Sequence, residues 1–320
     1  MIFNGLSFAK SYLFEKENPF ITNKFISLNL PIKRNNTQYC AGISNHFMTK
    51  NELKKILESI RYFDSFKSLI KKTYSNIEYG KRLGTKSFNS LFDADAHYNY
   101  NGKERDELFE SWNKTLNSKE STEEDLLIVC LEIFDWGKVL NSNVKTAIEL
   151  YKQNELKNYL NRLSDLLKVE KTLNTKEKEY EIIWTSGWTK VYSFMNNDII
   201  IYDSRVSAFL NFSLIQNYDS FDLEQITNFK KLTKLLFSFG GFNKRERKVD
   251  KKYGFKNQHP KEINGFNSNL ISSWIVQLTI ETLNLEQNVR AFERAFFMLG
   301  FDLKQIKTID NRNSMTNLSQ

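Results

Sequence analysis

The stretch that decides the fold is IIWTSGWTKVYSFMNNDIIIYDSRVSAFL, residues 182–210. Residues 185–187 predict a tight turn, and the apolar spacing after them predicts a short helix that ends at Asn196. Residues 199–201 are consecutive isoleucines, which predicts an extended segment through the protein interior. Asp203 follows where the next apolar-faced helix begins. The stretch therefore places a carboxylate between a buried segment and a helix.

Helical spacing of apolar residues dominates the rest of the chain. The predicted helices cover residues 49–70, 105–116, 125–134, 144–169, 232–239, 268–283 and 285–300. Only three prolines and twelve glycines interrupt 320 residues, which favours long helices. Strand candidates are few beyond residues 199–202. We therefore expect an all-α fold with little or no sheet.

The composition is that of a basic globular protein. Its net charge of +8 favours polyanion partners, although many basic proteins bind no nucleic acid. The two cysteines and three histidines are scattered, so we expect neither a metal site nor a cofactor. There is no run of eighteen apolar residues and no leader pattern, so we expect a soluble cytoplasmic protein with no membrane contact.

Asp203 has two interpretations that are compatible with each other. An Asp before a helix is a favoured N-cap, because its side chain accepts hydrogen bonds from the first free amides. The same contacts keep the carboxylate ionised, which a catalyst that stabilises a cation requires. Position alone favours the capping interpretation.

The residues around Asp203 resemble the active-site region of helix-hairpin-helix DNA glycosylases. The shared order is a turn, a helix, an apolar extended segment and then Tyr202-Asp203-Ser204-Arg205-Val206. Together with IFDWG at residues 133–137, this segment is similar to bacterial proteins with the 8-oxoguanine DNA glycosylase fold. The close match covers about 30 residues, and the helical pattern extends it over roughly residues 50–300.

The resemblance implies two packed helical lobes, with the hairpin and Asp203 lining a cleft between them. In this organisation residues 1–47 form an irregular segment, residues 48–310 the glycosylase-like domain with its catalytic region at 182–210, and residues 311–320 a polar tail. Asp203 corresponds to the catalytic carboxylate of the family.

The sequence departs from the family in two places. Gly187 is the single glycine of the hairpin, where the family usually has two separated by one residue. Lys190 lies thirteen residues before Asp203, which is closer than the Schiff-base lysine of lyase-active relatives. Lys190 is therefore either the nucleophile on a shortened helix or a contact to phosphate or solvent.

Further residues have a functional and a structural interpretation. Residues 242–261 mix basic and aromatic side chains, as in a nucleic-acid groove or in a solvated loop. The expected DNA contacts are Gly187, Trp188, Thr189, Arg205, Lys244, Arg245, Arg247 and Lys248. The expected base-pocket residues, each of which is also explained as core, are Trp136, Trp184 and Phe194.

The sequence thus leads to the hypothesis of a monomeric DNA glycosylase. It would cleave the bond between deoxyribose and a damaged or modified base in double-stranded DNA, with AP-lyase activity if Lys190 is the nucleophile. Base-excision repair and defence against phage with modified DNA fit equally. The alternatives are an inactive DNA-binding protein of the same fold and a helical protein-interaction module.

Overall fold

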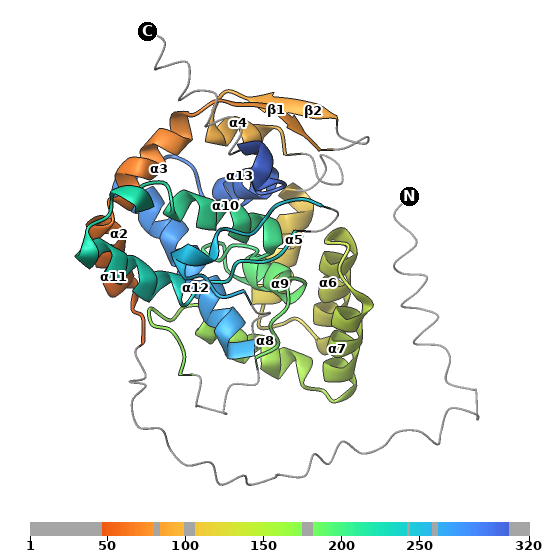
Figure 1. Ribbon diagram of the computed structural model, residues 1–320. Helices are drawn as coiled ribbons and strands as arrows, with labels where there is room; N and C mark the ends of the chain where they lie inside the picture. The colour runs from red at the N-terminus through yellow and green to blue at the C-terminus, as the bar shows by residue number, and fades with distance from the viewer. Residues whose placement is uncertain are drawn as a thin grey trace. The chain divides into compact units, whose positions relative to one another are not determined.

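The computed structural model describes residues 47–79, 84–98, 106–174, 182–241, 244–257 and 262–306. The predicted N-terminal segment lies outside these residues except for Phe47, and so does the predicted polar tail of residues 311–320. The described residues belong to one compact unit and are mostly helical, which confirms the all-α prediction (Figure 1). None of the described helices is both long enough and apolar enough to cross a membrane.

The helices form two groups according to their main contacts. The first group contains α5 (Asp106–Asn117), α6 (Glu123–Trp136), α7 (Asn141–Lys152), α8 (Leu156–Leu166) and α9 (Trp188–Met195). The second contains α2 (Lys50–Ser59), α3 (Tyr62–Lys71), α4 (Leu91–Ala96), α10 (Ser204–Leu214), α11 (Leu223–Thr233), α12 (Glu262–Leu283) and α13 (Val289–Leu299). Single 3-10 turns occur at Tyr218–Ser220 and Lys251–Tyr253. In Figure 1, α6 and α7 lie side by side, and α4 lies next to α13.

A small antiparallel sheet accompanies the helices. It consists of β1 (Tyr74–Glu78) and β2 (Thr85–Phe88), with Tyr74 opposite Phe88 and Glu78 opposite Thr85. The sequence analysis did not predict these two strands. Their buried residues cover the end of the helical core, as Tyr74 and Phe88 are both fully buried.

Two predicted helices are each divided into two. The helix predicted for residues 49–70 is α2 and α3, separated at Arg61, which has a φ of 52°. The helix predicted for residues 144–169 is α7 and α8, separated at Asn154 with a φ of 55°. A single left-handed residue redirects the chain, while the apolar spacing on either side remains helical.

The prediction of a helix at residues 232–239 is wrong. Helix α11 ends at Thr233, and residues 236–238 are extended beside Lys256. The Lys256 amide donates to the Leu236 carbonyl at 3.0 Å, and the Ser238 amide donates to the Lys256 carbonyl at 2.8 Å. The apolar run in this region therefore fills the core as an extended segment.

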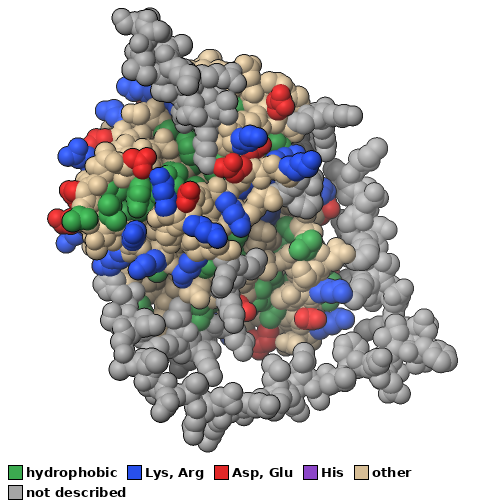
Figure 2. Space-filling model, in the orientation of Figure 1, with side chains coloured by type: hydrophobic (Ala, Val, Ile, Leu, Met, Phe, Trp, Pro, Cys, Tyr) green, Lys and Arg blue, Asp and Glu red, His purple; other side chains and the backbone are tan. Residues whose placement is uncertain are grey.

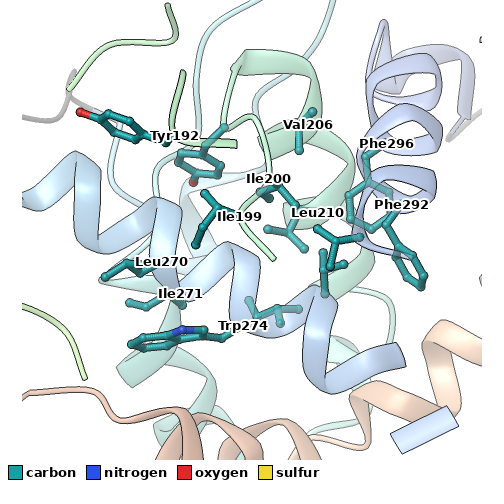
Figure 3. Packing of buried hydrophobic residues seen from close by; sticks show 14 of the residues in the cluster. Tyr192, Ile199, Ile200, Val206, Leu210, Leu270, Ile271, Trp274, Phe292 and Phe296 are labelled. Atoms are coloured by element: carbon teal, nitrogen blue, oxygen red, sulfur yellow. The ribbon is translucent and has the colours of Figure 1, made fainter. Parts of the chain in front are cut away.

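The predicted buried segment at residues 199–201 is confirmed. Ile199 and Ile200 lie among side chains of α12, α10 and α13 (Figure 3). Helix side chains satisfy the backbone of Ile200, because the Ser273 hydroxyl accepts from its amide at 3.1 Å and the Asn269 amide group donates to its carbonyl at 2.9 Å. These buried polar residues of α12 hold the segment that leads to Asp203.

Candidate active site

The predicted turn and helix around Lys190 are present. Residues 185–187 form the turn, α9 begins at Trp188, and Asn196 is its C-cap. Lys190 is therefore the third residue of α9, and its side chain turns back so that Nζ donates to the Ser186 carbonyl at 2.9 Å. The amine lies beside the turn, and Lys190 is half-buried.

Asp203 is the N-cap of α10, as its position in the sequence predicts. Its backbone is extended, and Oδ1 accepts from the amides of Arg205 at 2.8 Å and Val206 at 3.0 Å. Asp203 is half-buried and lines a pocket. The capping contacts therefore fix the carboxylate without sealing it inside the protein.

Lys190 and Asp203 line the same pocket, which has a volume of about 180 Å³. This volume lies below the roughly 300–1,000 Å³ typical of sites for drug-sized ligands. The wall combines charged and aromatic side chains from both groups of helices and from the segments between them. The lining residues are Tyr98, Trp136, Gly137, Lys190, Ile201, Asp203, Ser204, Arg205, Val206, Arg247, Glu293, Arg294 and Phe297.

Glu293 of α13 supplies a second carboxylate to this pocket. It is 7% exposed, and Oε2 accepts from the Ile201 amide at 2.6 Å and from the Arg290 guanidinium at 2.9 Å. Arg290 also donates to the Ser193 carbonyl of α9. Burial raises the pKa of Glu293, and the Arg290 charge opposes this shift. Glu293 and Arg290 thus join α13 both to α9 and to the segment before Asp203.

The environment of Lys190 lowers the pKa of its amine. Burial lowers the pKa of Lys190, while the negative charges of Asp203 and Glu293 act in the opposite direction. Desolvation is the largest contribution, because a buried ammonium loses its hydration. A neutral amine beside a carboxylate can act as a nucleophile towards an electrophilic carbon.

Arginines hold the pocket wall at the start of α10. Arg247 is buried, and it donates from NH1 to the Ser204 hydroxyl at 2.6 Å and from Nε to the Phe301 carbonyl at 3.2 Å. Arg205 lies over the ring of Phe297, with its guanidinium carbon 4.2 Å from the centroid. Arg247 and Arg205 were predicted to contact DNA, and their present contacts brace the wall of the pocket.

Backbone contact joins α10 to the end of α13. A Cβ added at Gly300 would lie 1.9 Å from the Arg205 carbonyl oxygen, so no other residue fits there without movement. The ends of the two helices that carry Asp203 and Glu293 are therefore held at close range.

The three predicted base-pocket aromatics have different positions. Trp136 lines the pocket, whereas Trp184 and Phe194 are not among its lining residues. Trp184 is buried against Gly265 of α12, where an added Cβ would lie 2.2 Å from the indole ring. Phe194 packs edge-on against Trp136, with ring centroids 5.6 Å apart. Trp184 and Phe194 thus belong to the core, and only Trp136 is in a position to contact a ligand.

The hairpin residues are packed inward. Trp188 and Thr189, two of the expected DNA contacts, are fully buried, so their side chains are part of the core rather than of a DNA-facing surface. A Cβ on Gly187 would lie 2.7 Å from the Asn143 side chain, which also accepts from the Thr185 hydroxyl at 2.5 Å. The physical reason is that an aromatic residue after the turn anchors it to the core.

The remaining predicted DNA contacts lie closer to the surface. Lys244 and Lys248 are exposed, and Arg245 is half-buried with its guanidinium carbon 3.9 Å from the Phe301 ring centroid. Figure 2 shows Lys and Arg side chains spread over the visible face, with acidic side chains among them. The basic charge on this face is therefore distributed rather than gathered in one patch.

Glu293 and Gly137 are among the pocket residues that the sequence analysis did not name as site residues, and Glu293 carries a signal in the sequence. Glu293 lies within the buried stripe of α13, next to Phe292, where a charged residue is unusual. Gly137 entered the sequence analysis only as the last residue of IFDWG, and nothing local indicates that it faces Lys190.

The comparisons with known proteins add no relative. No protein-family model, curated protein or solved structure matches this chain. Within the described ranges, no group of three or more His, Cys, Asp or Glu side chains is placed to hold a metal ion. The resemblance to helix-hairpin-helix glycosylases therefore stays a prediction from the residues that suggested it.

Proposed function

We propose that this protein is a DNA glycosylase with AP-lyase activity, in which Lys190 is the nucleophile and Asp203 the catalytic carboxylate. The observation that carries the proposal is the meeting of these two side chains in one pocket, with the pKa of Lys190 lowered by burial. The substrate class is double-stranded DNA that contains a damaged or modified base.

Asp203 acts on the charge that develops during base excision. As the bond between C1′ and the base nitrogen breaks, positive charge builds on the deoxyribose, and a fixed carboxylate stabilises it. The amides of Arg205 and Val206 already orient Oδ1, so no reorganisation is needed during the reaction.

Lys190 forms the covalent link to the sugar. Its neutral amine attacks C1′, and the electron pair of the C1′–N bond leaves with the base, which takes up a proton. The amine proton is lost and the sugar ring opens, which gives a Schiff base between Nζ and C1′. Elimination of the 3′-phosphate from this imine would then cut the strand.

The surroundings of the pocket suit a flipped nucleotide. A base must leave the stack to reach a recessed site, and apolar side chains commonly enter the gap. Leu140 lies in the loop that begins at Gly137, and it is 77% exposed. Trp136 and Phe297 provide aromatic surface in the pocket wall, and Lys244 and Lys248 provide exposed positive charge.

The proposal includes a monomeric protein that acts in the cytoplasm. Repair of the cell's own DNA and attack on modified phage DNA require the same chemistry, and the base that is excised would distinguish them.

The decisive experiment is a panel of duplexes with different bases. The protein is incubated with duplexes that carry 8-oxoguanine, an alkylated purine, uracil or 5-hydroxymethylcytosine, with alkali to reveal abasic sites and borohydride to trap a Schiff base. We expect product from at least one duplex and a covalent adduct that disappears in Lys190→Ala. Lys152→Ala is the control. This lysine is exposed at the end of α7 and does not line the pocket.

The absence of product and adduct across a broad panel would overturn the proposal. Salt-dependent binding to DNA without product would then indicate a DNA-binding protein without catalysis. No salt-dependent DNA binding would indicate a protein-interaction module.

A further inference from the structure

Gly137 makes close contact with the side chain of Lys190. A Cβ added at Gly137 would lie 2.4 Å from Lys190 Cδ and 2.6 Å from Cε, well inside van der Waals distance. The aliphatic part of Lys190 therefore crosses the end of α6 directly over the α-carbon of Gly137.

The backbone of Gly137 does not require glycine. Its φ of −73° and ψ of −7° are in the right-handed helical region, which every residue adopts. A glycine that ends a helix usually has a positive φ, and this one does not. Space for Lys190 is the structural feature that accounts for the missing side chain.

We propose that Gly137 is a positioning residue for Lys190, because its bare α-carbon lets the lysine side chain lie flat and hold its amine in the pocket with Asp203. The inference rests on the proposed function for its catalytic meaning. The contact between Gly137 and Lys190 itself does not depend on that function.

The effect of Gly137→Ala depends on which neighbouring atoms move to make room for the new Cβ. The two nearest atoms that a Cβ would meet, Cδ and Cε of Lys190, are near the end of a flexible chain, and the third is the Ile133 carbonyl oxygen at 3.2 Å. The severe overlaps are therefore with Lys190, which gives way more readily than the backbone. Gly137→Ala should fold normally and displace the amine from the Ser186 carbonyl and from the pocket. The charged groups that face this amine are Asp203 from α10 and Glu293 from α13, with Arg205, Arg247 and Arg294 in the same wall.

The test compares Gly137→Ala with Gly240→Ala. The control makes the same change at a position where the new Cβ would lie 3.5 Å from Lys248 Cε, an ordinary contact. The first measurement is the rate at which acetic anhydride labels Lys190, followed by mass spectrometry as a function of pH. Only the neutral amine reacts, so the rate rises as the pH passes the pKa of Lys190.

We expect the midpoint for Gly137→Ala to move upward, towards that of an ordinary lysine, because the displaced amine regains water. The midpoint for Gly240→Ala should match that of the unmodified protein. In borohydride trapping, Gly137→Ala should reduce the single-turnover rate by about a hundredfold with little change in DNA affinity, since a small misplacement of a reacting group has an effect of this size.

Unchanged labelling and trapping in Gly137→Ala would overturn the inference. A labelling shift without product on any duplex would support the contact and refute the proposed function instead. If Gly137→Ala does not fold, the double variant with Lys190→Ala decides, because removing the lysine side chain frees the space. Recovery of folding in the double variant supports the contact, and continued failure to fold overturns it.

Discussion

The start of α10 and the start of α11 have the same local structure and different surroundings. Asp203 caps α10 through the amides of Arg205 and Val206. Asp222 caps α11 through the Gln225 amide at 2.8 Å, and the Gln225 side chain accepts from the Asp222 amide at 3.0 Å. Both carboxylates accept hydrogen bonds from helix amides, which is the usual contact of an aspartate N-cap.

The difference lies in what the rest of the fold brings to each cap. Asp222 is exposed and is followed by Leu223, which is 84% exposed. Asp203 lies in a pocket with Lys190 from α9 and Glu293 from α13. A local pattern thus defines an N-cap, and only distant elements make one of the two caps a candidate catalyst.

Replacing each aspartate with asparagine tests most directly whether Asp203 has a role beyond capping its helix. Asparagine caps a helix about as well as aspartate, so both variants should fold. Asp203→Asn should reduce the single-turnover rate of base excision by about a hundred- to a thousandfold, because a fixed charge beside the cationic sugar is lost. Asp222→Asn should leave the rate unchanged. Equal activity of the two variants would mean that Asp203 serves only as a cap.

The exposed leucines Leu140 and Leu223 provide a second test of the difference between the two regions. Leu140→Ala should slow excision from duplex DNA by about tenfold, because a smaller side chain fills less of the gap left by an extruded base. Excision from single-stranded DNA should change little, since no stacked gap forms there. Leu223→Ala, at the more exposed leucine beside Asp222, should affect neither substrate. A similar loss in both variants would contradict a role for Leu140 in the duplex.

The smallest expected effect is one that the two caps share. Asp203→Ala and Asp222→Ala should each lower the free energy of unfolding by about 1 kcal/mol, because each removes hydrogen bonds to helix amides. Denaturant unfolding of the two purified variants measures this directly. A much larger loss at Asp203 would show that the pocket network depends on its carboxylate for stability.

Local signals in the sequence predicted much of the fold. The end of α9 at Asn196 and the extended segment before Asp203 both depend on residues within a few positions of each other. The breaks at Arg61 and Asn154 were not predicted, because one left-handed residue leaves the apolar spacing intact.

The candidate site was predicted only in part, because some of its residues are far apart in the sequence. Lys190 and Asp203 belong to one continuous stretch, whereas Gly137 and Glu293 reach the pocket from α6 and α13. Trp184 was misplaced because an aromatic side chain has the same local pattern in a core and in a pocket. Composition and spacing do not specify which helix faces a pocket.

The contact between Gly300 and Arg205 has a consequence for how the pocket meets a ligand. With no side chain between them, the end of α13 lies directly against the backbone at the start of α10, and backbone packed this closely has little room to move. The shape of this wall is therefore established when the chain folds. If the protein acts as proposed, an arriving nucleotide would have to adjust to this wall, and the work of deformation would be done on the DNA.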